Sequence, residues 1–174
     1  MGVIISAGHS AATAAELRAA IAAGLRAITH LHNGMPPMRN REPGLVGTAL
    51  LSELWCSVIA DGHHVAPEML RLSIAARPRR DRMVLVSDAM STVGGRDQFN
   101  LYGETIRVSG GKLVNENGSL AGAHTTLAES ISFLHNTVGI PLNDAFFMAS
   151  NVPFELMRIK RPTGLINRLV SFLP

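Results

Sequence analysis

The sequence is poor in the features that mark several protein classes. Its 174 residues include a single cysteine, Cys56, so no internal disulfide can form and a small disulfide-stapled fold is excluded. No apolar run approaches the roughly 20 residues that a membrane-spanning helix needs. At the amino terminus, no basic segment precedes an apolar one. We therefore expect a cytoplasmic protein with no export signal and no membrane partner.

Charged and aromatic residues are also scarce, at 17% and 5% of the chain. Fourteen of the 16 cationic residues are arginines, and they are spread along the sequence. The densest run, residues 77–82, is interrupted by a proline and an acid. Nucleic-acid-binding modules need basic residues on one face and aromatic side chains for stacking, so we expect no nucleic-acid partner. The 47% of hydrophobic residues is enough for a domain with its own core.

Short apolar runs alternate with helical segments through the first half of the chain. Four runs rich in aliphatic residues are typical of buried strands, at residues 3–7, 27–31, 56–60 and 83–87. Helices are expected between them, at residues 13–24, about 45–54 and 67–76. Thr13 and Glu16 have the capping-box spacing at the start of the first helix. Strands joined through helices predict an α/β architecture with a parallel sheet covered on both faces.

The alternation changes after the fourth predicted strand. Residues 101–108 and 112–114 have strand character and flank Ser109-Gly110-Gly111. A second turn is expected at residues 115–118. We therefore predict a β-hairpin excursion over about residues 99–118.

Helical periodicity returns in the last third of the chain. It covers about residues 125–138 and 142–157, and Pro153 is expected to separate two short helices in the second stretch. The apolar stretch at 164–174 has no evident partner in the sequence.

Polar residues follow each of the four predicted strands. They are Gly8-His9-Ser10, His30 with Asn33, residues 61–64, and Asp88. In a parallel sheet or barrel the carboxyl ends of all strands lie at one rim, so these side chains should converge. Two histidines and a carboxylate can form part of the first shell of a divalent metal that acts on bound water, and His9, His30 and Asp88 are that set. Taken singly, each histidine is more typical of a hydrogen-bonded residue near the surface than of a metal ligand.

Two loops carry groups that suit an anionic ligand such as phosphate. Asn33 and Gly34 could present backbone N–H donors, and Arg41 could present a fixed cation. The alternative is a flexible loop with a surface arginine. Leu120-Ala121-Gly122 precedes the helix predicted from residue 125, where a glycine lets the backbone approach a ligand. An ordinary first helical turn is the alternative there.

The remaining histidines are assigned by their surroundings in the sequence. Successive side chains of an extended segment point to opposite sides, so His63 and His64 cannot both face the rim. We favour His64 for the site and predict that His63 is structural or exposed. His32, His124 and His135 have no converging partners and are predicted to be structural.

Six segments, in this order, resemble successive motifs of the N-acetylglucosamine-6-phosphate deacetylase family. They are GHSA at residues 8–11, THLHNGM at 29–35, REPG at 41–44, ADGHHV at 60–65, VSDAM at 86–90 and LAG at 120–122. The resemblance runs from about Ser6 to Gly164. Six motifs in order are far more specific than any one of them.

The resemblance implies a (β/α)8 barrel of the amidohydrolase superfamily and hydrolysis of the acetamide of N-acetylglucosamine 6-phosphate. A divalent metal, expected to be Zn²⁺, would take part, and complete members are expected to be homodimers. By position, His9 and His30 match the metal-binding histidines, and Asp88 matches the catalytic acid and base. The matched substrate-binding residues are Asn33, Gly34, Arg41, Asp61, His64, Leu120, Ala121 and Gly122. Gly34 stands where alanine is usual in the family.

The resemblance also indicates which parts of the family's pattern this sequence lacks. The acidic metal ligand of the family comes from a motif similar to His-x-Glu-Gly-Pro, upstream of the segment matched at residues 8–11. We therefore expect an incomplete barrel, with strands five to eight and their helices, over residues 1–164. A divergent tail is expected at 165–174. Two functions stay open: deacetylation, or phosphosugar binding by a truncated and catalytically inactive fragment.

Overall fold

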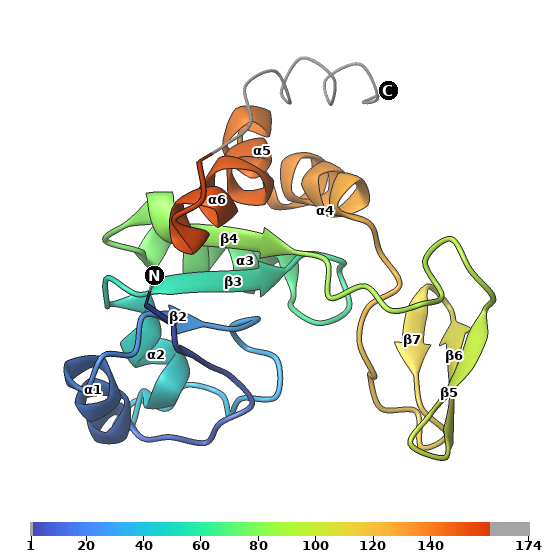
Figure 1. The fold of residues 1–174 in the computed structure, drawn as a ribbon, viewed down its shortest axis with the longest axis horizontal. Helices are drawn as coiled ribbons and strands as arrows, with labels where there is room; N and C mark the ends of the chain where they lie inside the picture. The colour runs from blue at the N-terminus through green and yellow to red at the C-terminus, as the bar shows by residue number, and fades with distance from the viewer. Residues whose placement is uncertain (1, 161–174) are drawn as a thin grey trace.

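Four parallel strands form the central sheet of the computed structural model, which describes residues 2–160 (Figure 1). They lie in sequence order as β1 (Ser6–Ala7), β2 (Ala27–Ile28), β3 (Trp55–Ile59) and β4 (Met83–Val86). Every neighbouring pair is parallel. The four strands, their parallel direction and the α/β architecture were therefore predicted correctly.

The first two strands are shorter than the sequence indicated. Val3 and Ile5, predicted within a buried strand, are 92% and 56% exposed. The second strand ends at Ile28 because the backbone leaves the extended conformation at His30, where φ is 30°. Apolar character alone did not reveal where the backbone turns.

Three helices connect the strands: α1 (Ala14–Ala22), α2 (Gly44–Leu50) and α3 (Pro67–Ala76). The capping box at the start of α1 is formed, because the Thr13 side chain accepts from the backbone N–H of Glu16 and the Glu16 side chain accepts from that of Thr13. Helix α2 ends at Leu50, before the predicted end at Leu54, and α3 has the predicted bounds. A short 3-10 helix, η1 (Arg80–Arg82), precedes β4.

The two faces of the sheet have different surroundings. Alternate strand residues, among them Cys56, Val58 and Leu85, are buried in the main core together with Leu17, Val46 and Leu70 from the three helices. On the other face, a cavity of about 570 Å³ is lined by Trp55, Ser57, Val84 and Val86 among others. The prediction that both faces are covered therefore holds fully for one face only within residues 2–160.

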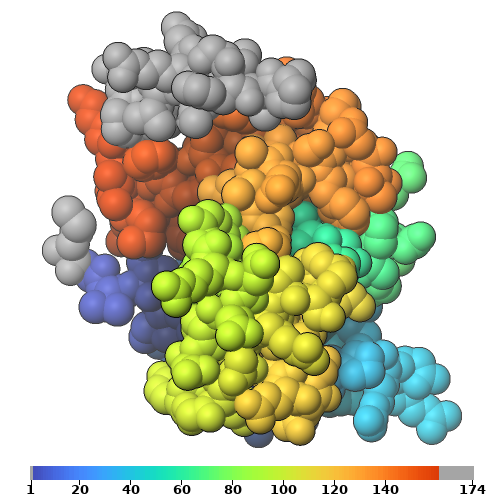
Figure 2. All heavy atoms as spheres, turned by 90° about the vertical axis from the view of Figure 1, so that its right-hand side faces the viewer, coloured from blue at the N-terminus to red at the C-terminus, as the bar shows by residue number. Residues whose placement is uncertain are grey.

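A separate antiparallel sheet stands beyond the carboxyl ends of the parallel strands (Figures 1 and 2). It consists of β5 (Gln98–Leu101), β6 (Glu104–Ser109) and β7 (Lys112–Val114). The predicted hairpin turn is present, with positive φ at Gly110 and Gly111. The strand predicted at 101–108 is confirmed from Glu104 onward, but its start is wrong, because the chain turns at Tyr102 and Gly103, where φ is 49° and 90°. A tyrosine is unusual in such a turn, so the sequence did not reveal it.

Four helical segments follow: α4 (Leu127–Phe133), η2 (Leu134–Val138), α5 (Leu142–Ala149) and α6 (Asn151–Met157). Segment η2 is a π-helix that continues α4. The break between the last two helices is at Ser150, and Pro153 lies within α6. The prediction that Pro153 separates them is wrong, because proline is tolerated in the first turn of a helix. The predicted tail at 165–174 lies outside the described residues, as does the end of the domain predicted at 164.

No helix within residues 2–160 combines the length and the apolar character needed to cross a membrane.

Candidate active site

Four polar residues occupy the same place relative to their strands. Each lies two positions after the last strand residue: His9 after β1, His30 after β2, Asp61 after β3 and Asp88 after β4. Because the strands are parallel neighbours, all four residues come at one end of the sheet. In Figure 1 it is the end toward which the arrows of β3 and β4 point, on the side of the β5–β7 sheet. The convergence at one rim was predicted from the sequence.

Three of these four residues have a left-handed backbone. The φ angle is 46° at His9, 30° at His30 and 53° at Asp88. Non-glycine residues rarely adopt this region, and each instance costs about 1–3 kcal/mol. Strained backbone of this kind clusters at functional sites, where the surrounding structure imposes it. The repetition at three strand ends indicates that the rim is built to place these side chains.

Ser57, in the middle of β3, holds the turned backbone at His30. The hydroxyl of Ser57 accepts a hydrogen bond from the backbone N–H of His30 at 2.6 Å, and its carbonyl accepts from the N–H of Leu31 at 2.7 Å. The side chain thus replaces a backbone acceptor at the point where β2 stops. A role for Ser57 was not predicted, and its only signal in the sequence is a hydroxyl residue within an otherwise apolar strand.

Removing this hydroxyl should loosen His30. We expect Ser57→Ala to lower the free energy of unfolding by about 1–2 kcal/mol, because it leaves the His30 N–H without its acceptor in a half-buried position. Ser57→Thr keeps a hydroxyl and should lose less than half of that amount. Urea denaturation followed by the fluorescence of Trp55, the single tryptophan, measures both variants. Equal losses in the two variants would contradict the proposed role of the hydroxyl.

The imidazoles of His9 and His30 meet edge to face. Their ring centroids are 4.8 Å apart with an interplanar angle of 60°. Two imidazoles that share one zinc ion have ring centres roughly 5 Å apart, since each Zn–N bond is about 2.0–2.1 Å. His9 is exposed, and Nδ1 of His30 is buried with no hydrogen-bond partner in the described part of the chain. The pair therefore fits two ligands of one metal ion.

The expected set of His9, His30 and Asp88 is not assembled as one cluster. Within residues 2–160, no three His, Cys, Asp or Glu side chains are grouped closely enough to hold a metal ion. Asp88 is separated from the two histidines along the rim. It follows β4, and β3 lies between β4 and β2, the strand that precedes His30. The sequence predicted the common rim correctly, but not how the side chains are spaced along it.

The loop with the predicted anion-binding residues lies against His9. Gly34 has φ +63°, and a Cβ atom there would be 2.8 Å from Cγ and Nδ1 of His9. Asn33, its neighbour, is half-buried and donates its backbone N–H to the carbonyl of His30 at 2.9 Å. The structure therefore brings Asn33 and Gly34 to the two histidines, as predicted for one common site.

The loop at Leu120, Ala121 and Gly122 is joined to Asp88. The backbone N–H of Ala123 donates to the carbonyl of Asp88 at 2.9 Å, and the N–H of Met90 donates to the carbonyl of Ala123 at 3.1 Å. A Cβ atom on Gly122, where φ is 89°, would lie 2.5 Å from Cγ of Met90. On its other side, Ala121 donates to the carbonyl of Leu113 in β7 at 3.0 Å. This loop therefore connects the β5–β7 sheet to Asp88.

The side chains of Asp61 and His64, which follow β3, are hydrogen-bonded to each other. One carboxylate oxygen, Oδ1, accepts from the backbone N–H groups of His63 and His64, both at 2.9 Å. The other, Oδ2, lies 2.7 Å from Nδ1 of His64. The side chains of His64 and Asp61 are only 2% and 5% exposed. His63 is exposed, with its ring next to Gly111 of the β6–β7 turn, as expected for the histidine outside the site.

Arg41, the predicted phosphate-binding cation, lies in the loop between β2 and α2 and is exposed. Its neighbour Glu42, for which no role was predicted, fixes that loop. Oε1 of Glu42 accepts from the backbone N–H groups of Ala14 at 2.8 Å and Gly44 at 2.9 Å. These hydrogen bonds lower the pKa of Glu42. They tie the start of α1 to the start of α2.

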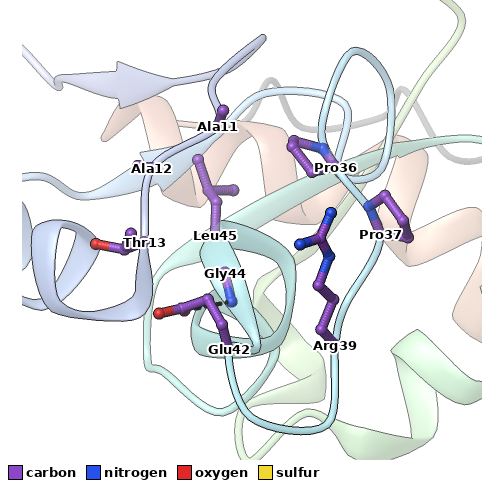
Figure 3. A pocket seen from close by; sticks show the side chains of 9 residues that line it. All are labelled: Ala11, Ala12, Thr13, Pro36, Pro37, Arg39, Glu42, Gly44 and Leu45. Atoms are coloured by element: carbon purple, nitrogen blue, oxygen red, sulfur yellow. Dashed lines mark hydrogen bonds between the residues drawn. The ribbon is translucent and has the colours of Figure 1, made fainter.

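A small cavity of about 200 Å³ lies beside this junction (Figure 3). Its lining includes Glu42, Gly44, Pro37 and Arg39, and it reaches Thr13 before α1. None of the predicted site residues is among the residues that line it.

The three histidines predicted to be structural have partners within the fold. Nε2 of His32 lies 2.7 Å from Oγ of Ser73, and burial lowers the pKa of His32. Nδ1 of His124 lies 2.9 Å from Oγ1 of Thr92, and Nδ1 of His135 lies 3.0 Å from the carbonyl of Ile140. These contacts agree with a structural role.

Comparison with known proteins shows to which family the chain belongs. No family model matches the chain. The N-acetylglucosamine-6-phosphate deacetylase of Vibrio furnissii is 36% identical over 165 residues, which cover 94% of this chain and 41% of that protein. A candidate N-acetylgalactosamine-6-phosphate deacetylase of Escherichia coli K12 is 33% identical over 137 residues, which cover 78% of this chain and 81% of that protein. The chain belongs to the N-acetylglucosamine-6-phosphate deacetylase family.

Solved structures of deacetylases have the same fold over the matched part. The N-acetylglucosamine-6-phosphate deacetylase of Pasteurella multocida superposes with a TM-score of 0.86 at 36% identity, covering 91% of this chain and 42% of that one. A mutant of the Mycobacterium smegmatis enzyme, in complex with N-acetyl-D-glucosamine-6-phosphate, superposes with a TM-score of 0.81 at 31% identity. This deacetylase-family chain therefore spans about two fifths of the length of the V. furnissii and P. multocida proteins.

The Asp61–His64 pair gives this deacetylase-family chain an acid-sensitive contact. Burial alone would raise the pKa of Asp61, but the hydrogen bonds from His64 and His63 outweigh it and lower the pKa from 3.8 to about 2. A carboxyl whose pKa is lowered by folding stabilises the fold above its unfolded pKa, and this contribution is lost as the pH falls. The shift corresponds to about 2 kcal/mol.

We therefore expect the free energy of unfolding to fall by about 2 kcal/mol between pH 4 and pH 2 through this one group. Urea denaturation at several pH values measures the slope. In Asp61→Asn the slope over this interval should be shallower than in the wild type. An unchanged slope would show that other carboxyl groups dominate the acid sensitivity.

Proposed function

We propose that this chain carries the catalytic part of a metal-dependent deacetylase that converts N-acetylglucosamine 6-phosphate to glucosamine 6-phosphate and acetate. The observation that carries the proposal is the placement of His9, His30 and Asp88 in strained backbone at the ends of parallel strands. Their position in a chain that belongs to this deacetylase family supports the same chemistry here.

The proposed architecture is an incomplete (β/α)8 barrel formed by strands five to eight and their helices, with the hairpin excursion inserted after the last strand. Its support is the sequential order of four parallel strands joined by helices. The cavity beside Trp55, Ser57 and Val84 lies on the sheet face that would point into a closed barrel. We further propose a cytoplasmic enzyme whose complete members are homodimers.

In the proposed mechanism His9 and His30 supply two ligands of a divalent metal, expected to be Zn²⁺. When bound, such a metal polarises the amide carbonyl and lowers the pKa of water. Asp88 accepts the proton of the attacking water on its carboxylate and later returns a proton to the leaving nitrogen, so it acts first as base and then as acid. The carbonyl of Asp88 accepts from the backbone N–H of Ala123, and this hydrogen bond keeps the carboxylate at the rim for both steps.

The proposed substrate contacts surround these groups. Asn33 and Gly34 lie next to His9, and the loop from Leu120 to Gly122 lies next to Asp88. Arg41 is proposed to pair with the phosphate, and His64 to contact the sugar phosphate from the third strand end. The metal-binding pair, the proton-transferring carboxylate and the anion-binding groups then share one rim.

The proposal is tested by measuring acetate release from N-acetylglucosamine 6-phosphate and from N-acetylgalactosamine 6-phosphate. The 174-residue chain is assayed with added Zn²⁺, both alone and with a separately supplied amino-terminal part of the V. furnissii relative. We expect activity in at least the second condition, with a loss of at least about a hundredfold in Asp88→Asn because proton transfer contributes that much. Absence of acetate release in both conditions would refute deacetylation by this chain.

A second function, phosphosugar binding without turnover, is favoured by one observation. The described residues bring together only two histidine ligands at His9 and His30, fewer than the three protein ligands of typical catalytic zinc sites. Calorimetric titration with glucosamine 6-phosphate tests binding directly. Arg41→Ala should weaken binding at least tenfold, whereas Arg71→Ala, which removes an exposed arginine from α3, should not change it. No heat, or equal affinity in Arg41→Ala, would refute a binding role for Arg41.

A further inference from the structure

The resemblance assigns Asp61 to substrate binding, but the geometry gives this carboxylate other partners. Oδ1 accepts two backbone N–H groups, from His63 and His64, and Oδ2 is bonded to the His64 ring. Both oxygens of this carboxylate are thus engaged by its neighbours, so it has little capacity left for a ligand.

The contact fixes which nitrogen of His64 carries hydrogen. The carboxylate of Asp61 is ionised at neutral pH, since its pKa is about 2, and an ionised carboxylate only accepts hydrogen bonds. Nδ1 of His64, at 2.7 Å, must therefore be the protonated nitrogen. Nε2 is then the ring nitrogen left for a ligand, and in the neutral ring it is an acceptor.

The backbone around the pair prevents the ring from turning away. The same carboxylate that holds the ring also holds the N–H groups of His63 and His64, so the loop and the imidazole share one anchor. Gly62, with φ 76°, lets the chain reverse between Asp61 and His64, and a Cβ atom there would be 3.0 Å from the Phe133 ring.

We propose that Asp61 is a positioning residue: it locks His64 in the Nδ1–H form and presents Nε2 to the phosphosugar at the rim. That Nε2 meets the phosphosugar rests on the proposed function, whereas the locked form of the ring does not. Asp61 acts through His64 and makes no contact with the sugar itself.

The first test measures directly which nitrogen of the His64 ring carries hydrogen. In ¹⁵N-labelled chain at pH 8, long-range ¹H–¹⁵N correlation spectra should show His64 with a protonated Nδ1 and an unprotonated Nε2, with the signals assigned by their loss in His64→Gln. In Asp61→Asn the amide oxygen can still accept from the two backbone N–H groups. Its NH₂ group now donates to Nδ1, so the proton should move to Nε2.

Asp81→Asn is the matched control, because it removes the same charge from an exposed ion pair with Arg79. It should leave the His64 signals unchanged. An unprotonated Nδ1 in the wild-type chain would overturn the proposal, even if Asp61→Asn failed to fold. A wild-type pattern in folded Asp61→Asn would overturn it as well.

The second test measures the affinity for glucosamine 6-phosphate by calorimetry. We expect Asp61→Asn to bind at least tenfold more weakly. In the neutral ring the substitution turns Nε2, which can accept from a sugar hydroxyl, into a donor, and in the protonated ring it removes the neighbouring countercharge. Unchanged or tighter binding, with the proton moved to Nε2, would overturn the role toward the ligand. If the wild-type chain does not bind the sugar phosphate, the proposed function fails, and the spectra alone decide whether Asp61 locks His64.

Discussion

Replacing Arg77 with alanine is expected to lower the free energy of unfolding by about 3 kcal/mol. Arg77 is only 4% exposed, and burial lowers its pKa. Its guanidinium donates to the carbonyl of Ala49 in the last turn of α2 and to the carbonyl of Leu54 just before β3. Carbonyl groups at a helix end have no partner within the helix, and a cation there is favoured by the helix dipole.

The large expected effect has two physical sources. Alanine would leave two carbonyl oxygens without their donor, and it would leave a cavity where the aliphatic stem of Arg77 packs. Arg71→Ala, which removes an exposed arginine from α3, the helix that ends just before Arg77, is the control and should change stability by less than about 0.5 kcal/mol. Urea denaturation followed by Trp55 fluorescence measures both. A loss below about 1 kcal/mol in Arg77→Ala would contradict the role assigned to the guanidinium.

Gly34→Ala is expected to displace the ring of His9 and to lower stability by about 1–2 kcal/mol. The methyl group would lie 2.8 Å from Cγ and Nδ1 of His9, well inside van der Waals contact, and φ at this position is +63°. A left-handed backbone costs about 1–2 kcal/mol for a residue with a Cβ atom. The His9 ring must then rotate away from its place 4.8 Å from the His30 ring.

The consequence is measured by Zn²⁺ affinity in competition with a chelating dye and by the ring proton signals of the two histidines. We expect at least a tenfold weaker affinity and shifted His9 signals. Gly110→Ala is the matched control, because φ there is +57° and no atom lies within 4 Å of the added Cβ. It should cost similar stability without affecting Zn²⁺ or His9. Equal Zn²⁺ affinity in Gly34→Ala and the wild type would show that Gly34 does not influence the proposed metal ligands His9 and His30.

The resemblance implies alanine at the position of Gly34. With alanine there, the His9 ring of this chain would need a different place, because the methyl group would fill the present one. The identity of residue 34 and the position of the His9 ring are therefore coupled.

The order of the elements and the rim of the sheet could be predicted because they depend on local patterns. The apolar runs, the capping box at Thr13 and the proline that opens α3 each act within a few residues of sequence. Parallel strands then require that the residues after them share one end. The turn at Tyr102 and the break at Ser150 escaped prediction because neither residue is typical of its conformation.

The site itself depends on contacts between distant segments, which no local pattern contains. Ser57 supports His30 across 27 positions, and Glu42 ties the start of α1 across 28. The engagement of Asp61 with His64 is short in sequence, but the burial of both side chains, only 2% and 5% exposed, is a property of the folded chain. These residues have ordinary types, so only their neighbours in space reveal what they do.

The sequence by itself determined the α/β class, the four parallel strands, the family and the rim on which the polar residues gather. Hydrophobic periodicity and ordered motifs carry that information along the chain. Only the tertiary structure decided that His9 and His30 form a pair from which Asp88 stands apart, and that both oxygens of Asp61 are engaged by its neighbours. Spacing along the rim is set by the order of strands in the sheet and by the left-handed backbone after them, and both are properties of the packed sheet.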